Sequence, residues 1–352
     1  MVFKSSLRDK DKKVLNFVIE SFVRNGRPVS SGAISQTRRI PASPATLRNI
    51  MAKLEEMGYL SQPHTSAGRV PTDKGLRHYV GRLLAEKSLP EERVPLIQEE
   101  FPNRTADLDS LLLQACRILA DTSDALGFVI SPHIFRLPFE HLRFIKISDR
   151  RVLVILVTPF HMVLTETLES AIPLTQTELD RASQYVNQNF RGKTILAVRE
   201  ALVLDLPKYR VKYEDTLNKL HDLLKTSIDK ERDDRIFLQG TSRLLGKAGL
   251  SDLNNLRSLF RSFEEKAVLV RLLSDFISLD RVKVLIGSEA NIPNVEDCSL
   301  VLSHYGYTNQ VLGTLGVIGP KRIPYEKIIS IVDRMAKRVS IAITVFGKEV
   351  SL

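Results

Sequence analysis

The chain has 352 residues, of which 43% are hydrophobic and 26% are charged, and its formal net charge is +10. This composition excludes a disordered or collagen-like chain, and the length is sufficient for two or three domains. No run of about 18 apolar residues is present, and the N-terminus lacks the apolar core of a signal peptide, so we expect a cytoplasmic protein. Cys116 and Cys298 lack a CxxC spacing and are predicted to be buried, reduced thiols rather than a disulfide or a metal pair.

The positive charge is concentrated at one end of the chain. Residues 1–87 hold 16 lysines and arginines against 7 aspartates and glutamates, which gives a net charge of +9. The rest of the chain holds 35 against 34 and is nearly neutral. A basic module joined to a neutral body is typical of a nucleic-acid-binding protein, whereas a general requirement for solubility would spread the charge along the chain.

Three helices are predicted within this basic segment. The first spans residues 7–25 and ends at Gly26, because glycine is the preferred residue after a helix C-terminus. A short second helix is predicted to begin at Ser30 or Ser31 and to end at Gln36. The third helix follows after a short connection, which is the order of a helix-turn-helix unit.

The third predicted helix, residues 44–57, has the features of a DNA-recognition helix. Ser43 is a favourable N-cap, and Pro44 suits the first helical position. One face of the helix is apolar and the other is small and polar: the first consists of Leu47, Ile50, Met51 and Leu54, and the second of Ala45, Arg48, Asn49, Ala52 and Lys53. Arginine, asparagine and lysine can bond base edges or phosphates. Taken alone, such a helix is also compatible with a solvated amphipathic surface helix.

A β-hairpin is predicted directly after this helix. Residues 59–62 and 69–70 can pair around a loop at residues 63–68. The hairpin tip and its base carry polar and basic side chains, namely His64, Thr65, Ser66 and Arg69. A helix-turn-helix followed by such a hairpin is a winged helix, whose wing usually touches phosphates or the minor groove.

The remainder of the chain mixes helices and strands. Residues 88–104 contain three prolines and an acidic cluster and are predicted to be a linker. Helices are predicted at 108–126, 177–190, 194–204, 213–229, twice within 252–275, and at 325–343, and strands at 127–131, 142–147, 152–157, 162–168, 235–239, 282–286, 300–303 and 315–318. The three strands between residues 142 and 168 have short connections, which indicates an antiparallel meander. We therefore expect an α+β protein of several domains.

No combination of residues indicates catalysis. Residues 191–194 (Arg-Gly-Lys-Thr) resemble the end of a phosphate-binding loop, but Asn187 stands where the first glycine is required. Gly313, Gly316 and Gly319 do not have the GxGxxG spacing and are predicted to serve close backbone packing. The histidines have no metal-ligand spacing, so we expect no cofactor, no metal ion and no enzymatic activity.

Three blocks of sequence resemble the HrcA family of heat-inducible transcription repressors. They are SPATLRNIMAKLEEMGYLSQPHTSAGRVPTDKG at residues 43–75, DCSLVLSHYG at residues 297–306 and GTLGVIGPKRIPY at residues 313–325. The PHTSAGRVPTDKG part is the most specific of these motifs, and the resemblance extends from about residue 5 to residue 342.

The resemblance implies a domain organisation and a set of partners. It implies a winged-helix domain at residues 1–87, a discontinuous GAF-like α/β domain at residues 105–137 and 233–345, and an α/β dimerisation domain inserted at residues 138–232. It also implies a homodimer that binds an inverted-repeat operator in double-stranded DNA upstream of chaperone operons. A GroEL-type chaperonin is expected to maintain the active repressor.

The expected DNA-binding residues lie in the recognition helix and the wing. They are Ser43, Thr46, Arg48, Asn49 and Lys53 in the former, and His64, Thr65, Ser66 and Arg69 in the latter. A ligand-sensing regulator is the alternative function, because GAF-like folds often hold small molecules, although no small-molecule ligand is identified from the sequence. Generic RNA binding by the basic module is a further alternative, which competition between operator duplex and RNA would test.

Overall fold

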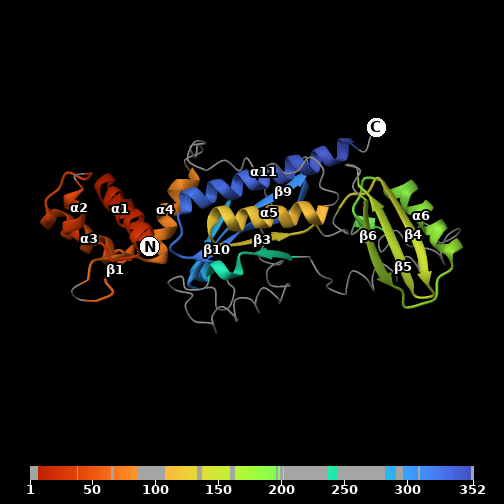
Figure 1. The fold of residues 1–352 in the computed structure, drawn as a ribbon, viewed down its shortest axis with the longest axis horizontal. Coiled ribbons are helices and arrows are strands. Elements are labelled where there is room, and N and C mark those ends of the chain that lie inside the picture. Colours follow the sequence, from red (N-terminus) through yellow and green to blue (C-terminus); the bar gives the residue numbers. More distant parts are fainter. Residues whose placement is uncertain are drawn as a thin grey trace.

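The structure is a computed structural model in which most of the chain is described. The described residues are 7–37, 39–64, 67–85, 108–132, 137–158, 163–195, 197–198, 201, 236–244, 282–290, 296–307 and 310–349. The predicted linker at 88–104, the predicted helices at 213–229 and 252–275, and most of the helix predicted at 194–204 lie outside these residues. Figure 1 shows three structural units in a row, with the N-terminal helices at one end.

The N-terminal unit contains the three helices and the hairpin expected of a winged helix-turn-helix. Its elements are α1 (Asp9–Asn25), α2 (Ser31–Gln36), α3 (Pro44–Glu56), β1 (Leu60–Ser61), β2 (Val70–Pro71) and α4 (Asp73–Ala85). The strands β1 and β2 pair antiparallel, as predicted. Helix α1 packs against α2, α3 and α4, so the apolar stripes of the four helices share one core.

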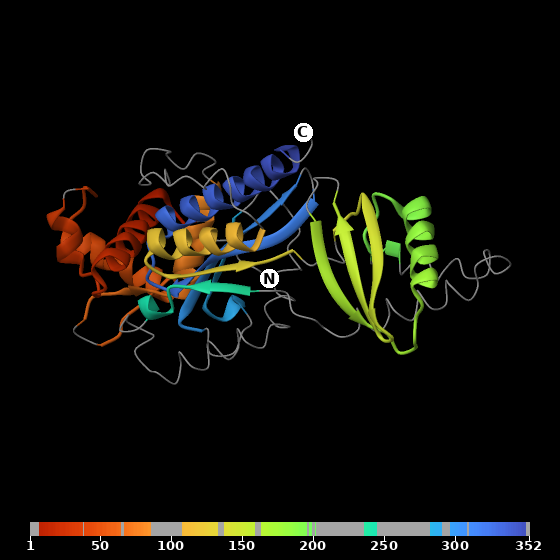
Figure 2. The same cartoon turned by 45° about the vertical axis from the view of Figure 1, so that its right-hand side comes forward.

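A five-stranded antiparallel sheet forms the middle of the molecule. Its strands are β3 (Leu126–Ile130), β7 (Ile236–Gln239), β8 (Lys283–Ile286), β9 (Cys298–Tyr307) and β10 (Gln310–Pro320), in the spatial order β7-β3-β10-β9-β8. Two helices, α5 (Leu108–Ser123) and α11 (Tyr325–Glu349), lie side by side against one face of this sheet (Figure 2). Two short 3-10 turns, η3 (Thr241–Leu244) and η4 (Gly287–Ala290), follow β7 and β8.

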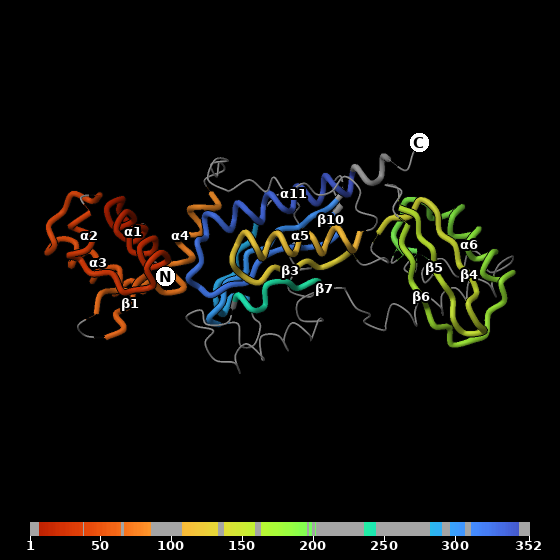
Figure 3. Tube along the Cα trace, viewed as in Figure 1, coloured from red at the N-terminus to blue at the C-terminus, as the bar shows by residue number. Residues whose placement is uncertain are grey.

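A separate three-stranded sheet lies between β3 and β7 in the sequence. Its strands are β4 (His141–Ser148), β5 (Arg151–Val157) and β6 (Val163–Glu169), paired antiparallel in sequence order, and α6 (Gln176–Phe190) packs against it. This confirms the predicted meander. The chain therefore leaves the five-stranded sheet after β3 and returns to it at β7, which the Cα trace in Figure 3 makes easy to follow.

The described residues form two hydrophobic cores. One runs without interruption from the N-terminal unit to the helices and inner face of the five-stranded sheet. The other lies between α6 and the three-stranded sheet and includes Phe139, Phe144, Val154 and Leu179. The second core supports the prediction that residues 138–232 contain an inserted domain, whose boundaries stay a prediction.

The structure corrects the lengths of several predicted elements. The strands predicted at 300–303 and 315–318 are parts of the much longer β9 and β10, which together form a hairpin. The predicted strands stop at the polar residues His304 and Thr314. In the structure these two side chains form a hydrogen bond across the hairpin, with His304 Nδ1 2.8 Å from Thr314 Oγ1, so both strands continue through them. Helix α5 ends at Ser123, three residues before its predicted end at residue 126. Helix α11 continues to Glu349, beyond its own predicted end at residue 343.

Two other sequence expectations are confirmed. Both cysteines are buried and free, and burial raises the pKa of the Cys116 thiol to about 12. Gly313 allows the close packing that was predicted, because a Cβ atom there would overlap the hydroxyl group of Tyr305. The Tyr305 hydroxyl donates instead to the carbonyl oxygen of Ile130 at 2.7 Å, which ties β9 to β3 across β10.

Candidate nucleic-acid interface

Helix α3 presents a polar face to solvent and an apolar face to the core. Leu47, Met51 and Leu54 are buried, which fixes the rotation of the helix about its own axis. The predicted site residues at the start of the helix, Ser43, Thr46, Arg48 and Asn49, are all exposed. The structure therefore places these four together on the outer surface of the unit.

The first turn of α3 is held by its N-cap. The backbone amide of Thr46 donates to Ser43 Oγ at 3.2 Å, and the two hydroxyl oxygens lie 2.9 Å apart. Pro44 occupies the first turn, where its missing N–H leaves no hydrogen bond unmade. The exposed N-terminal end of a helix attracts anions, so this end is suited to lie against a DNA phosphate.

Two arginines that the sequence reasoning did not single out lie close to α2 in the chain. Arg27 precedes α2 and Arg39 lies in the connection between α2 and α3, and both are exposed. In a helix-turn-helix the first helix of the motif crosses the DNA backbone, so basic residues at its ends can contact phosphates. The sequence could have indicated these two residues, because both are basic and lie in the connections on either side of the short predicted helix.

The wing is joined to the helical part by a third extended segment that was not predicted. Val29 and Arg69 form an antiparallel bridge, in which the amide of each residue donates to the carbonyl of the other at 2.9 and 2.8 Å. Gly68 permits this approach, because a Cβ atom at that position would overlap the carbonyl group of Val29. The base of the hairpin is therefore fixed to the segment that leads into α2.

Lys53, which was predicted to face DNA, has a partner within the unit. Its Nζ donates to Asp11 Oδ2 of α1 at 2.6 Å. The side chain of Asp11 is only 6% exposed, whereas that of Lys53 is 43% exposed. The ion pair satisfies a carboxylate at the edge of the core and ties α3 to α1.

Arg69 is likewise engaged within the unit. Its Nε donates to Glu55 Oε2 at 2.9 Å, and one terminal nitrogen lies 2.8 Å from the same oxygen. The Arg69 side chain is only 17% exposed. This pair links the last turn of α3 to the base of the hairpin, so Arg69 helps to orient these two elements relative to each other.

The tip of the wing is described only in part. His64 is exposed at the start of the loop, while Thr65 and Ser66 lie outside the described residues. The amide nitrogen of the Gln62 side chain donates to the carbonyl of Ala67 at 3.0 Å, which braces the two sides of the loop. Contact of these residues with DNA stays a prediction.

The described residues contain no cluster that could hold a metal ion. Among them, no three His, Cys, Asp or Glu side chains are grouped so that they could hold a metal ion. Within the same part of the chain, no helix is long and apolar enough to cross a membrane. What the geometry does present is a capped, exposed polar helix face beside a fixed hairpin, in the segment that carries nearly all of the net charge.

Comparison with known proteins decides the family. A family model described as the HrcA protein C-terminal domain matches residues 109–329, which is more than half of the chain. The chain belongs to the HrcA family. The family is one of heat-inducible transcription repressors, so the prediction of a transcription regulator rather than an enzyme is confirmed.

Full-length relatives of this HrcA family member agree with the assignment. The heat-inducible transcription repressor HrcA of Geobacter sulfurreducens is 36% identical over 336 residues, which cover 96% of this chain and 98% of the relative. The repressor of Xanthomonas campestris pv. campestris is also 36% identical over 336 residues, with 96% of each chain covered. That of Xylella fastidiosa is 33% identical over 341 residues, with 97% of each chain covered.

A solved structure shares the fold of this HrcA family member. A crystal structure described as that of a hypothetical protein superposes with a TM-score of 0.65 at 24% sequence identity. The match covers 97% of this chain and 100% of the other. The fold comparison therefore extends over the N-terminal unit as well as the region that the family model matches.

Proposed function

We propose that this HrcA family member represses transcription by binding an inverted-repeat operator as a homodimer, with α3 in the major groove and the β1–β2 hairpin as a wing. The observation that carries the proposal is the exposed group Ser43, Thr46, Arg48 and Asn49 on a helix whose opposite face is buried. Arginine and asparagine are the side chains that pair most specifically with guanine and adenine edges in the major groove.

The internal ion pairs refine the division of roles in this site. Arg48 and Asn49 would read bases, while Ser43, Thr46, Arg27 and Arg39 would contact phosphates. Lys53 and Arg69 would act chiefly by orienting α3 relative to α1 and the wing, because each already faces a carboxylate of its own unit. His64, Thr65 and Ser66 would serve the wing tip.

Base readout by Arg48 and Asn49 is tested by substitution. Duplexes are first selected from random DNA with the parent protein, and binding of Arg48→Ala and Asn49→Ala to the selected operator is then measured. Each loss of a bidentate base contact should weaken binding by about 1–3 kcal/mol and relax the preference at one position of each half-site. Arg117→Ala, which removes an exposed arginine from α5, is the matched control and should bind as the parent does. Parent-like affinity of both α3 variants would refute the recognition-helix assignment.

The proposed homodimer has a surface that suits it. Alternate residues of the three-stranded sheet face α6, and the opposite face carries Ile145, Leu153, Ile155, Val157 and Val163. Val163 on the edge strand is 61% exposed. Arg143, Thr165 and Thr167 lie among these apolar side chains on the same face. A mixed face of this kind, apolar with polar groups that can form hydrogen bonds, is suited to pair with a second copy.

We also propose, from the family resemblance, that a GroEL-type chaperonin maintains the active repressor. Apolar side chains such as Ile147, which is 52% exposed, would be available to a chaperonin in a subunit that has not yet assembled. Operator binding should then be lost on heating and be regained with chaperonin and ATP. A repressor that recovers fully without chaperonin contradicts this part of the proposal.

A further inference from the structure

Helix α4 is shared between the DNA-binding unit and the body of the protein. It starts two residues after the wing strand β2 and packs against α1 on one side. On the other side it contacts β8 of the five-stranded sheet. The helix is therefore part of two packed units at once and is not a tether between them.

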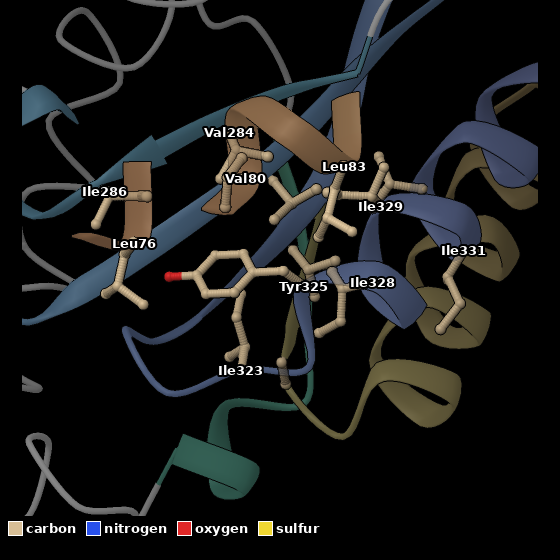
Figure 4. Packing of buried hydrophobic residues seen from close by; sticks show 14 of the residues in the cluster. Leu76, Val80, Leu83, Val284, Ile286, Ile323, Tyr325, Ile328, Ile329 and Ile331 are labelled. Atoms are coloured by element: carbon tan, nitrogen blue, oxygen red, sulfur yellow. The ribbon is translucent and has the colours of Figure 1, made fainter. Parts of the chain in front are cut away.

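The contact between α4 and the body has an apolar centre. Figure 4 shows Leu76, Val80 and Leu83 of α4 lying among side chains of β8, of the segment after β10 and of the start of α11. The body contributes Val284, Ile286, Ile323, Tyr325 and Ile329 to this group. Leu76, Val80 and Leu83 are at most 3% exposed, so this side of α4 is as well covered as the interior of a domain.

A bidentate ion pair lies at the edge of this apolar contact. Arg77 of α4 donates from Nε to Glu289 Oε1 at 2.7 Å, and a terminal nitrogen also contacts Glu289 Oε2. The same terminal nitrogen donates to the carbonyl oxygen of Val284 at 2.7 Å, and Glu289 Oε2 accepts from the amide of Ile286 at 2.9 Å. Burial on its own would raise the pKa of Glu289, but the hydrogen bonds from Arg77 and the Ile286 amide together lower it.

A second ion pair holds the start of the same helix. Lys321 Nζ, in the segment between β10 and α11, lies 2.8 Å from Asp73 Oδ1 in the first turn of α4. The neighbouring Arg322 reaches the end of α1, since a Cβ atom at Gly26 would collide with its guanidinium group. This segment is held in turn by Tyr325, whose hydroxyl donates to the carbonyl of Lys321 at 2.8 Å.

We propose that the pairs Arg77–Glu289 and Asp73–Lys321 are positioning pairs for operator recognition. They hold the DNA-binding unit in one orientation on the body, so that the dimer recognises half-sites only at one spacing. Neither pair needs to touch DNA. The inference rests on the proposed binding of an inverted repeat by a homodimer.

The physical reason is the difference between a rigid and a flexible connection. Two binding units on flexible linkers reach half-sites over a range of separations, and each separation gives a modest effective concentration. Two units fixed on a common body have a high effective concentration for half-sites at one separation, and a very low effective concentration for half-sites at any other separation. Loosening the junction should therefore reduce discrimination between spacings and leave the affinity for one half-site unchanged.

The test measures binding to three duplexes. These are a single half-site, the inverted repeat at the spacing selected from random DNA, and the same repeat lengthened by half a helical turn, about 5 base pairs. Arg77→Glu and Glu289→Arg each place like charges together, and they should reduce the preference for the selected spacing about tenfold. Both should bind the single half-site within about twofold of the parent, which also shows that the DNA-binding unit is folded.

Compensation and a matched control complete the experiment. The double variant Arg77→Glu with Glu289→Arg restores opposite charges and should regain most of the spacing preference. Glu289→Gln is a milder change and should cause a smaller loss of spacing preference. Asp333→Asn is the control: it removes the carboxylate that pairs with Lys337 within α11 and should cause no loss of spacing preference.

The outcomes separate the two proposals. Parent-like spacing preference in Arg77→Glu and Glu289→Arg overturns the positioning role, and so does an equal loss of affinity for the single half-site. If the parent binds both repeats equally well but more tightly than the single half-site, the positioning role fails and dimeric binding stands. If the parent binds neither repeat more tightly than the single half-site, the proposed dimeric binding fails, and the positioning role fails with it.

Discussion

The charged residues of the N-terminal unit divide into those that face solvent and those that hold the unit together. Arg48 and Asn49 are exposed as the helical periodicity predicted. Lys53 lies at the boundary between the polar and apolar faces of α3, and its partner Asp11 is on another helix. No local pattern identifies such a partner, so the sequence could place Lys53 on the helix but could not determine what it binds.

Substitution of Lys53 should destabilise the unit. Lys53→Ala leaves the carboxylate of Asp11, which is 6% exposed, without its cation. Removing one member of a fully buried pair costs about 3–5 kcal/mol, but Lys53 is 43% exposed, so we expect a loss of about 1–2 kcal/mol in the free energy of unfolding. Denaturant unfolding measures it. Lys12→Ala, which breaks an exposed pair with Asp9, is the control and should change the stability little. If Lys53→Ala lowered the free energy of unfolding no more than Lys12→Ala does, the pair of Lys53 with Asp11 would contribute little to stability.

His78 of α4 gives the stability a dependence on pH. Burial, together with the charges of Lys12 and Arg82, lowers the pKa of His78 below its usual 6.5. The unfolded chain therefore takes up a proton at a higher pH than the folded protein does, and stability should fall as the pH drops through 6.5. The melting temperature should decrease between about pH 7.5 and pH 5.5 in the parent, and His78→Gln should reduce that decrease.

The control for this effect is His64, the other histidine of the N-terminal unit, which is exposed. His64→Gln alters a side chain at the wing and should leave the pH dependence of the melting temperature as it is in the parent. A parent-like pH dependence in His78→Gln would show that other groups cause it.

At the scale of elements, the first turn of α3 combines a structural and a binding role that can be separated. Ser43→Ala removes the N-cap and should reduce stability by about 0.5–2 kcal/mol. Ser43→Asp keeps an acceptor for the Thr46 amide and should restore stability, yet its negative charge would repel DNA phosphate and weaken operator binding. Thermal unfolding and DNA titration on the same samples measure both effects.

The matched control is the N-cap of α6. The amide of Glu178 donates to Thr175 Oγ1 at 3.3 Å, so Thr175→Ala should also reduce stability but should leave DNA affinity unchanged. Unaltered operator binding in Ser43→Asp would indicate that this end of α3 does not approach a phosphate.

Helices were easier to predict from the sequence than strands, for a physical reason. The apolar stripe of α3 repeats every three or four residues and its cap is a neighbouring residue, so both signals are local. In contrast, β9 and β10 contain His304 and Thr314, two buried polar residues that form a hydrogen bond with each other across the hairpin. The extended segment at Val29 was missed for the same reason, since its partner Arg69 is distant in sequence.

At the scale of the whole molecule, the open face of the three-stranded sheet determines the assembly state in our proposal. Ile155→Lys and Val163→Lys place a charge on this face and should convert the dimer to monomers in analytical ultracentrifugation. Operator affinity should fall with dimerisation, while binding to a single half-site should persist. Ile341→Lys is the matched control, because Ile341 is equally exposed, at 62%, but lies on α11. Variants of the sheet that remain dimeric would exclude this face as the dimer contact.

The domain arrangement illustrates what sequence patterns leave open. Composition and charge separated the basic N-terminal segment from the body, and the two sheets agree with the expected interruption of the central domain. The junction at α4 had no such signal. Arg77 and Glu289 belong to separate segments, and only the folded chain shows that the helix following the wing is also part of the body.

The strand order of the five-stranded sheet also has a consequence for synthesis on the ribosome. Strand β3 is made early, but its central neighbour β10 emerges only after the three-stranded sheet and β7, β8 and β9. Until then the nascent chain carries the apolar segment Leu126–Ile130 without the strand that pairs along its full length. Such delayed, long-range pairing slows folding and prolongs exposure to aggregation. The supply of active repressor would then follow the capacity of the cell to assist folding, which gives the proposed chaperonin dependence a kinetic basis in the topology.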